Sequence, residues 1–106
     1  MINKDLYQSA LDLWGFDAQV GMVIEECAEL ILALRKASRD IARKEDVIDE
    51  IADVRIMVEQ LIHMMDCHDE VNATYDRKIT RLALRIEECK STALQDEKKG
   101  KHENTN

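Results

Sequence analysis

The fold of this chain is decided by residues 19–37, which read QVGMVIEECAELILALRKA. Apolar side chains recur in this stretch at intervals of three and four residues, a spacing that places them on one side of an α-helix. They are Val20, Val23, Ile24, Cys27, Leu30, Ile31 and Leu34. The stretch predicts an amphipathic helix capped by Asp17. Its apolar side needs at least one other helix to cover it.

Three more helices are predicted around this one. A short helix over residues 4–14 comes first and ends at Gly15, because glycine readily adopts the backbone conformation that terminates a helix. A polar connection over residues 38–45 leads to a third helix over residues 47–65, and a fourth begins near Val71. The face of the fourth helix that we expect to be buried carries Val71, Tyr75, Ile79, Leu82, Ile86 and Cys89.

The composition agrees with an all-α protein of the four-helix-bundle type, with one short N-terminal helix and three longer ones. The chain has 106 residues, no proline and only three glycines, and its aromatic content is 4%. We expect one helical domain over residues 1–94 and a disordered polar tail over residues 95–106, where the apolar period is lost. A domain of this size gains stability from oligomerisation.

Charge and hydropathy exclude several classes of partner. The net charge of −7 disfavours nucleic acid polymers, which are held by clustered lysine and arginine. The longest apolar run, residues 30–34, is too short to span a membrane, and residues 1–10 lack the features of a signal peptide. Three cysteines without an export signal indicate reduced thiols. We therefore expect a cytoplasmic protein with no membrane partner.

Two pairs of acidic residues indicate a metal site. Glu26 and Glu29 lie three residues apart in one predicted helix, and Glu50 and Asp53 have the same spacing in the next. Residues at this spacing share one side of a helix, so two antiparallel helices would close four carboxylates around one cavity. Carboxylate oxygens suit Mg²⁺, and proteins mostly use Mg²⁺ to hold substrate phosphates. The pattern favours phosphate chemistry.

Other interpretations of the same residues were weighed. Helical acids are often simply solvated, and this chain has 22 of them. A di-iron carboxylate bundle requires Glu-x-x-His motifs, which the sequence lacks. A soft-metal site at His63, Cys67 and His68 lacks the paired spacing of a zinc site. A non-catalytic helical oligomerisation or adaptor module is the main alternative to an enzyme.

The order Glu26-x-x-Glu29, twenty residues, Glu50-x-x-Asp53 resembles a known family. Together with the flanking stretches WGFDAQ, EECAEL and EIADV, and a later helix carrying Asp76, Lys78 and Arg81, it is similar to MazG-like proteins of the all-alpha nucleoside triphosphate pyrophosphatase superfamily. The resemblance covers about residues 10–85. Asp76 stands where several relatives have asparagine, so no role is carried over to that position.

The resemblance implies an enzyme that uses Mg²⁺, or alternatively Mn²⁺, to hydrolyse a nucleoside triphosphate between its α and β phosphates. The products would be the nucleoside monophosphate and pyrophosphate. The implied metal ligands are Glu26, Glu29, Glu50 and Asp53. The resemblance also implies a homodimer or a tetramer built as a dimer of dimers, in which helices from two subunits complete the bundle.

The remaining candidate residues follow from side-chain chemistry. Glu25 or Asp49 would accept the proton of the attacking water. Lys78 and Arg81, three residues apart, would contact phosphates. An aromatic ring such as that of Trp14 or Phe16 stacks on a nucleobase, and an amide such as that of Gln19 reads its edge. Each of these residues also has a structural interpretation, as a core anchor or a solvated helix face.

Overall fold

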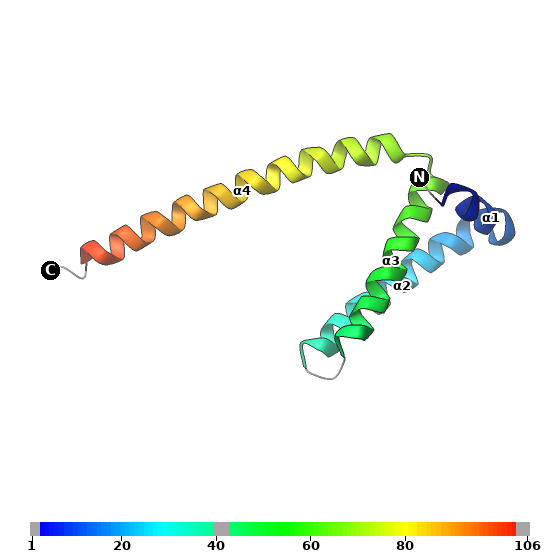
Figure 1. Ribbon diagram of the computed structural model, residues 1–106, viewed down its shortest axis with the longest axis horizontal. Coiled ribbons are helices and arrows are strands. Elements are labelled where there is room, and N and C mark those ends of the chain that lie inside the picture. The colour runs from blue at the N-terminus through cyan, green and yellow to red at the C-terminus, as the bar shows by residue number, and fades with distance from the viewer. Residues whose placement is uncertain (1–2, 40–42, 104–106) are drawn as a thin grey trace. The chain divides into compact units, whose positions relative to one another are not determined.

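The computed structural model describes residues 3–39 and 43–103. Within these ranges the chain forms four α-helices and no strands (Figure 1). They are α1 (Lys4–Trp14), α2 (Phe16–Ala37), α3 (Lys44–Met64) and α4 (His68–Glu103). The all-α, bundle-type prediction is confirmed. The chain divides into two compact units, Met1–His68 with the first three helices and Asp69–Asn106 with nearly all of α4.

One glycine serves as the end of α1 and the start of α2. Gly15 has a φ of 86°, its N–H donates to the carbonyl of Leu11, and its own carbonyl accepts from the N–H of Gln19. Glycine adopts this positive φ without steric penalty, so the chain turns within a single residue. α2 therefore begins at Phe16, earlier than the predicted residue 19, and Asp17 lies in its first turn rather than at the cap.

The two long helices of the first unit lie side by side and antiparallel (Figure 1). The start of α3 is fixed by Asp46, whose side chain accepts a hydrogen bond of 3.0 Å from the backbone N–H of Arg43. Lys44 and Glu45, predicted as part of the connection, belong to this helix. Residues 40–42 of the predicted connection lie outside the described residues.

The most buried positions of the seam between α2 and α3 lie outside the predicted apolar stripe of α2. Gln19 and Gln60 are each only 3% exposed, and Ala33 is also buried. By contrast Ile24 and Ile31, which the apolar period assigns to the core, are 66% and 61% exposed. The side of α2 that carries Gln19 and Ala33 is the one that faces α3. The apolar period finds the most hydrophobic side of a helix but does not say which neighbour covers it.

The short helix α1 is attached to α3 by two polar contacts. The Tyr7 hydroxyl donates a hydrogen bond of 2.5 Å to Glu59, and Tyr7 is buried. The side chains of Gln8 and His63 form a second hydrogen bond of 2.8 Å. Tyr7 is thus the anchor of α1, whereas the large apolar side chains Leu6 and Trp14 are exposed.

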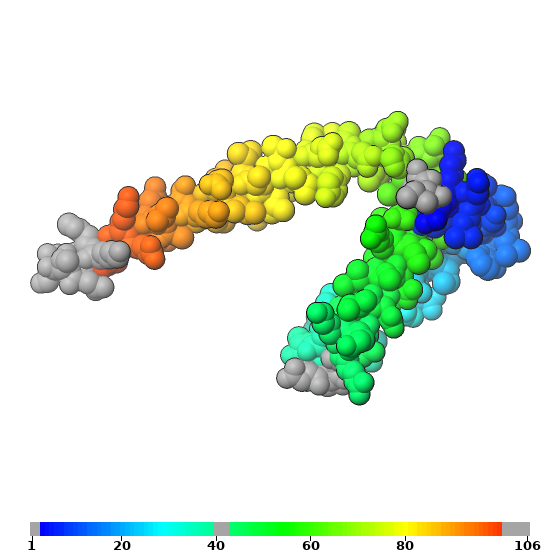
Figure 2. All heavy atoms as spheres, viewed as in Figure 1, coloured from blue at the N-terminus to red at the C-terminus, as the bar shows by residue number. Residues whose placement is uncertain are grey.

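Considered by itself, α4 is a rod one helix thick (Figure 2). Within this unit its predicted buried face is exposed, with Tyr75 at 62% and Leu82 at 51%, because a single helix cannot cover its own side chains. The helix continues to Glu103 and includes residues 95–103, where polarity predicts a disordered tail; residues 104–106 lie outside the described residues. Lysine, glutamate and glutamine are good helix formers, which explains this difference. No helix among the described residues has both the length and the hydropathy needed to cross a membrane.

Candidate functional site

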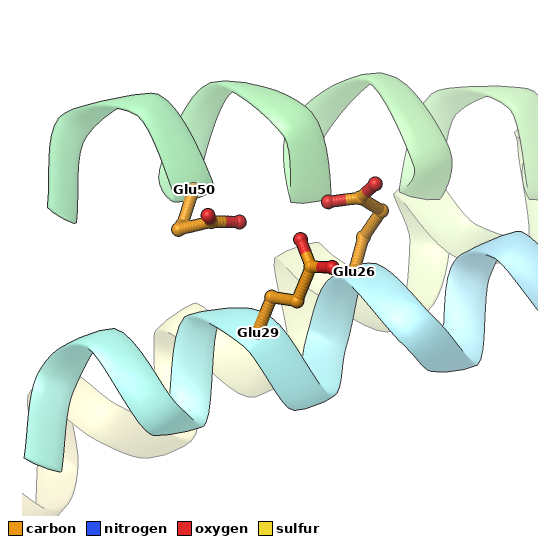
Figure 3. Close-up of side chains that lie close together, drawn as sticks. All are labelled: Glu26, Glu29 and Glu50. Atoms are coloured by element: carbon orange, nitrogen blue, oxygen red, sulfur yellow. The ribbon is translucent and has the colours of Figure 1, made fainter. Parts of the chain in front are cut away.

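Three of the predicted metal ligands meet in the seam between α2 and α3. Each of Glu26, Glu29 and Glu50 contributes a carboxylate oxygen, and these three oxygens lie within 4.8 Å of one another. Figure 3 shows the two side chains of α2 rising toward α3, and Glu50 pointing back toward α2. Glu26 and Glu29 share one side of α2 because they are three residues apart, and the antiparallel α3 brings Glu50 opposite them.

Two of these carboxylates contain oxygens that the protein leaves unsatisfied. The Oε2 atoms of Glu26 and Glu50 are buried and have no hydrogen-bond partner among the described residues. A buried acceptor without a partner is unfavourable, and a carboxylate more so than a neutral group. Two such oxygens beside a third carboxylate form a donor set suited to a hard cation.

The crowding of negative charge changes the acidity of the site. The pKa of Glu26 is raised above its ordinary value of 4.5, first by desolvation and then by the negative charges of Glu29 and Asp53. The pKa of Glu50 is raised for the same reasons, with a smaller contribution from Asp49. A bound cation would offset the repulsion that contributes to these shifts.

The other predicted acids lie at different distances from this group. Asp53 is close enough for its charge to raise the pKa of both Glu26 and Glu50, but it is not one of the three carboxylates that converge. Glu25 and Asp49, predicted as proton acceptors, are exposed and also lie outside the three. Neighbouring residues on a helix point in different directions, which separates Glu25 from Glu26.

A pocket of about 330 Å³ opens along the same seam, on the side of the acids nearer to α1. Two of its lining residues, Trp14 and Gln19, were predicted to contact a nucleobase; Phe16 does not line it. The full lining consists of Trp14, Ala18, Gln19, Met22, Met57 and Gln60. Met22 lies four residues before Glu26 and Met57 four residues after Asp53, so the pocket is about 6 Å, one helical turn, from the acids.

Sequence reasoning missed two parts of this pocket. By residue type alone neither Gln60 nor Met57 is a candidate, because a glutamine in a helix is usually solvated and a methionine usually packs in a core. The signal was present in the spacing: Asp53, Met57 and Gln60 follow one another at four and three residues, so they share one side of α3.

Two further groups of predicted residues lie elsewhere. Lys78 and Arg81 are exposed on α4, in the second unit. His63, Cys67 and His68 do not form a group of converging metal ligands within the part of the chain that the structure describes. The sulfur of Cys67 instead lies 3.8 Å from the carbonyl oxygen of Ile62, and all three cysteines are free.

The group of converging side chains includes no histidine, so its ligand atoms suit an oxygen-ligated cation rather than a di-iron centre. Comparison of the chain with protein-family models, with curated proteins and with solved structures finds no match.

Proposed function

We propose that this protein is a Mg²⁺-dependent nucleoside triphosphate pyrophosphohydrolase of the cytoplasm. It would cleave a ribo- or deoxyribonucleoside triphosphate between the α and β phosphates and release the monophosphate and pyrophosphate. Mn²⁺ is the alternative ion. The observation that carries the proposal is the convergence of Glu26, Glu29 and Glu50 within 4.8 Å, with two buried oxygens that lack partners.

The carboxylates fit a cation better than they fit a structural role. Acids that serve only solubility extend into water, where repulsion between them is screened. Here desolvation and neighbouring negative charge raise the pKa values of Glu26 and Glu50, so the fold holds these groups together against repulsion. Glu26, Glu29 and Glu50 would hold the ion, with Asp53 as the fourth ligand of the set.

The position of the pocket supports a nucleotide rather than a simple phosphate. The pocket and the acids occupy one seam about a helical turn apart, so a single ligand with a ring at one end and phosphates at the other spans both. Trp14 offers the aromatic face, and Met22 and Met57 offer thioethers that pack well against aromatic rings.

The proposed reaction is attack by water on the α-phosphorus. The water oxygen bonds to phosphorus, the bond to the bridging oxygen breaks, and pyrophosphate leaves with that oxygen. Bound Mg²⁺ supplies neutralisation of phosphate charge and polarisation of the water. The water proton passes to Asp49 or Glu25; Asp49 is the better supported, because its charge reaches Glu50.

A homodimer, or a tetramer built as a dimer of dimers, is part of the proposal. Considered by itself, the first unit has a hydrophobic side formed by exposed apolar residues of α2 and α3, including Ile24, Ile31 and Ile51, which a second copy can cover. The exposed apolar stripe of α4 that contains Tyr75 and Leu82 is a second surface that another copy can cover. Lys78 and Arg81, both exposed on α4, are the proposed phosphate contacts in such an assembly.

The test is release of pyrophosphate from a panel of nucleoside triphosphates with and without millimolar Mg²⁺. We expect hydrolysis of at least one nucleotide, strict dependence on the metal, and loss of activity in Glu50→Gln. Glu45→Gln, an exposed acid of the same helix, is the matched control and should keep full activity. Absence of pyrophosphate from every nucleotide in the panel would refute the enzyme proposal.

One observation favours the second candidate, a non-catalytic oligomerisation or adaptor module. The exposed apolar stripe of α4 suits the binding of another helix whether or not the acids bind metal. An adaptor requires no cation, so its thermal stability would not respond to Mg²⁺. The enzyme proposal predicts that millimolar Mg²⁺ raises the melting temperature of the wild type but not of Glu50→Gln.

A further inference from the structure

The pocket beside the acids has two polar side chains in an otherwise apolar lining. Gln19 comes from α2 and Gln60 from α3, while Trp14, Ala18, Met22 and Met57 complete the wall. Both glutamines are 3% exposed, so their amides are removed from bulk water. A ligand pocket of this kind is mostly apolar and contains a few placed polar groups that determine which ligand it accepts.

The two amides form a hydrogen bond with each other and can each form further hydrogen bonds. Nε2 of Gln60 donates a hydrogen bond to Oε1 of Gln19. An amide has two N–H donors and an oxygen that accepts twice. The Nε2 of Gln19 and the Oε1 of Gln60 make no other hydrogen bond among the described residues, yet neither is a fully buried orphan of the kind found in Glu26 and Glu50. In the lining of the pocket, Gln19 thus retains an unused donor and Gln60 an unused acceptor.

A donor and an acceptor that line the same pocket suit the edge of a nucleobase, which carries both acceptor and donor groups. The edge of a base and its face make different contacts, and the pocket supplies partners for both: amides for the edge, and the indole of Trp14 for the face.

We propose that the Gln19–Gln60 pair reads the hydrogen-bonding edge of the nucleobase, and that Gln60 is a specificity-determining residue of this pocket. The inference rests on the proposed function for its ligand, a nucleotide, but not on hydrolysis or on the metal. It predicts discrimination against a ring that stacks equally well but has no hydrogen-bonding edge, because such a ring would leave the amides without partners.

Trp14 makes the test direct, because it is the only tryptophan of the chain and it lines the pocket. A base stacked on the indole should quench its fluorescence. The probes are cytidine, uridine and adenosine, together with a ribose C-nucleoside that carries an unsubstituted benzene ring. All four lack phosphate, so the assay is run without metal and is independent of the acidic residues.

We expect the wild type to bind at least one natural nucleoside about tenfold or more tightly than the benzene nucleoside. In the double variant Gln19→Met/Gln60→Met, which keeps two long unbranched side chains but removes both amides, this ratio should fall to near one while the benzene nucleoside still quenches. Gln95→Met, on the exposed surface of α4, should behave as the wild type. Thermal unfolding of each variant checks its fold.

Three results of the binding assay would overturn the inference. One is the absence of quenching by any nucleoside in the wild type. Another is an unchanged ratio in the double variant. The third is an equal loss of affinity for natural and benzene nucleosides, which is the outcome expected if the pair only positions the helices. Pyrophosphate release with unaltered nucleotide preference in the double variant would reject the inference and leave the proposed function intact. Selective nucleoside binding without pyrophosphate release would support the inference and reject the proposed hydrolysis.

Discussion

The hydrogen bond between Gln19 and Gln60 gives a quantitative test of the α2–α3 seam. Replacing Gln60 alone with methionine preserves the length of the side chain but leaves the Oε1 of Gln19 without its donor. Because Gln19 is 3% exposed, that oxygen cannot recover a full hydration shell. An unpaired buried polar group costs about 1–3 kcal/mol. For a domain of this size the expected fall in melting temperature is roughly 5–20 °C.

The double variant should recover most of this loss. With methionine at both positions no polar group is left unpaired, and two thioether chains pack in the space of two amides, which is close to neutral. The assay is thermal unfolding of the wild type, both single variants and the double variant at one protein concentration, since association shifts the apparent stability. Single variants as stable as the wild type, or a double variant that loses the sum of the two single effects, would refute the seam geometry.

Three other changes test the acids and the anchor of α1. In metal-free protein at pH 7, Glu26→Gln should raise the melting temperature, because it removes one of several crowded negative charges. Glu45→Gln, at an exposed position, should leave the melting temperature nearly unchanged. A lower melting temperature in Glu26→Gln would contradict the repulsion described above. The pKa values of Glu26 and Glu50 in the folded protein exceed 4.5, so these two carboxyl groups bind more protons in the folded state than in the unfolded chain. The free energy of unfolding, measured in urea, should therefore decrease as the pH rises from about 4.5 until the pH passes the raised pKa values. A flat profile in metal-free protein would be inconsistent with these shifts. Tyr7→Phe removes the hydrogen bond to Glu59 and should lower stability by about 1–2 kcal/mol in urea unfolding, with no change in pyrophosphate released per folded molecule; an unaltered urea midpoint would show that this bond does not anchor α1.

The sequence predicted the helices and the acidic group well because both depend on local spacing. Apolar residues at three- and four-residue intervals require helices, and two acids three residues apart must share a helix face. Predicting that Glu26 and Glu29 converge with Glu50 needed only one further assumption, that the two helices are antiparallel neighbours. Asp53 shares the face of Glu50 but is not among the three that converge, since small rotations of a helix decide which side chains reach across.

The sequence did not predict which side of α2 faces α3. Ile24 and Ile31 form the more hydrophobic side, yet the seam contains Gln19 and Ala33. Hydrophobic periodicity measures how much apolar surface needs cover, and that cover can come from the same chain or from a second copy. Which element covers a helix face depends on the assembled structure, so it cannot be deduced from the local spacing of residues in one sequence.

The end of α4 shows a different limit. Residues 95–103 lack an apolar period, which was interpreted as disorder, but α4 continues to Glu103. Periodicity reports burial and helix propensity reports local backbone preference, and these are separate signals. Polar residues that favour the helical backbone extend a helix that already exists, because each added residue forms one hydrogen bond without a new nucleation step.

Calorimetric titration of Mg²⁺ into metal-free protein is the measurement that most directly tests whether the convergent carboxylates share a cation. The wild type should show saturable binding, Glu50→Gln should bind at least about tenfold more weakly, and Glu45→Gln should match the wild type. Identical titrations for all three proteins, or no binding heat at millimolar Mg²⁺ in the wild type, would contradict the proposed metal site.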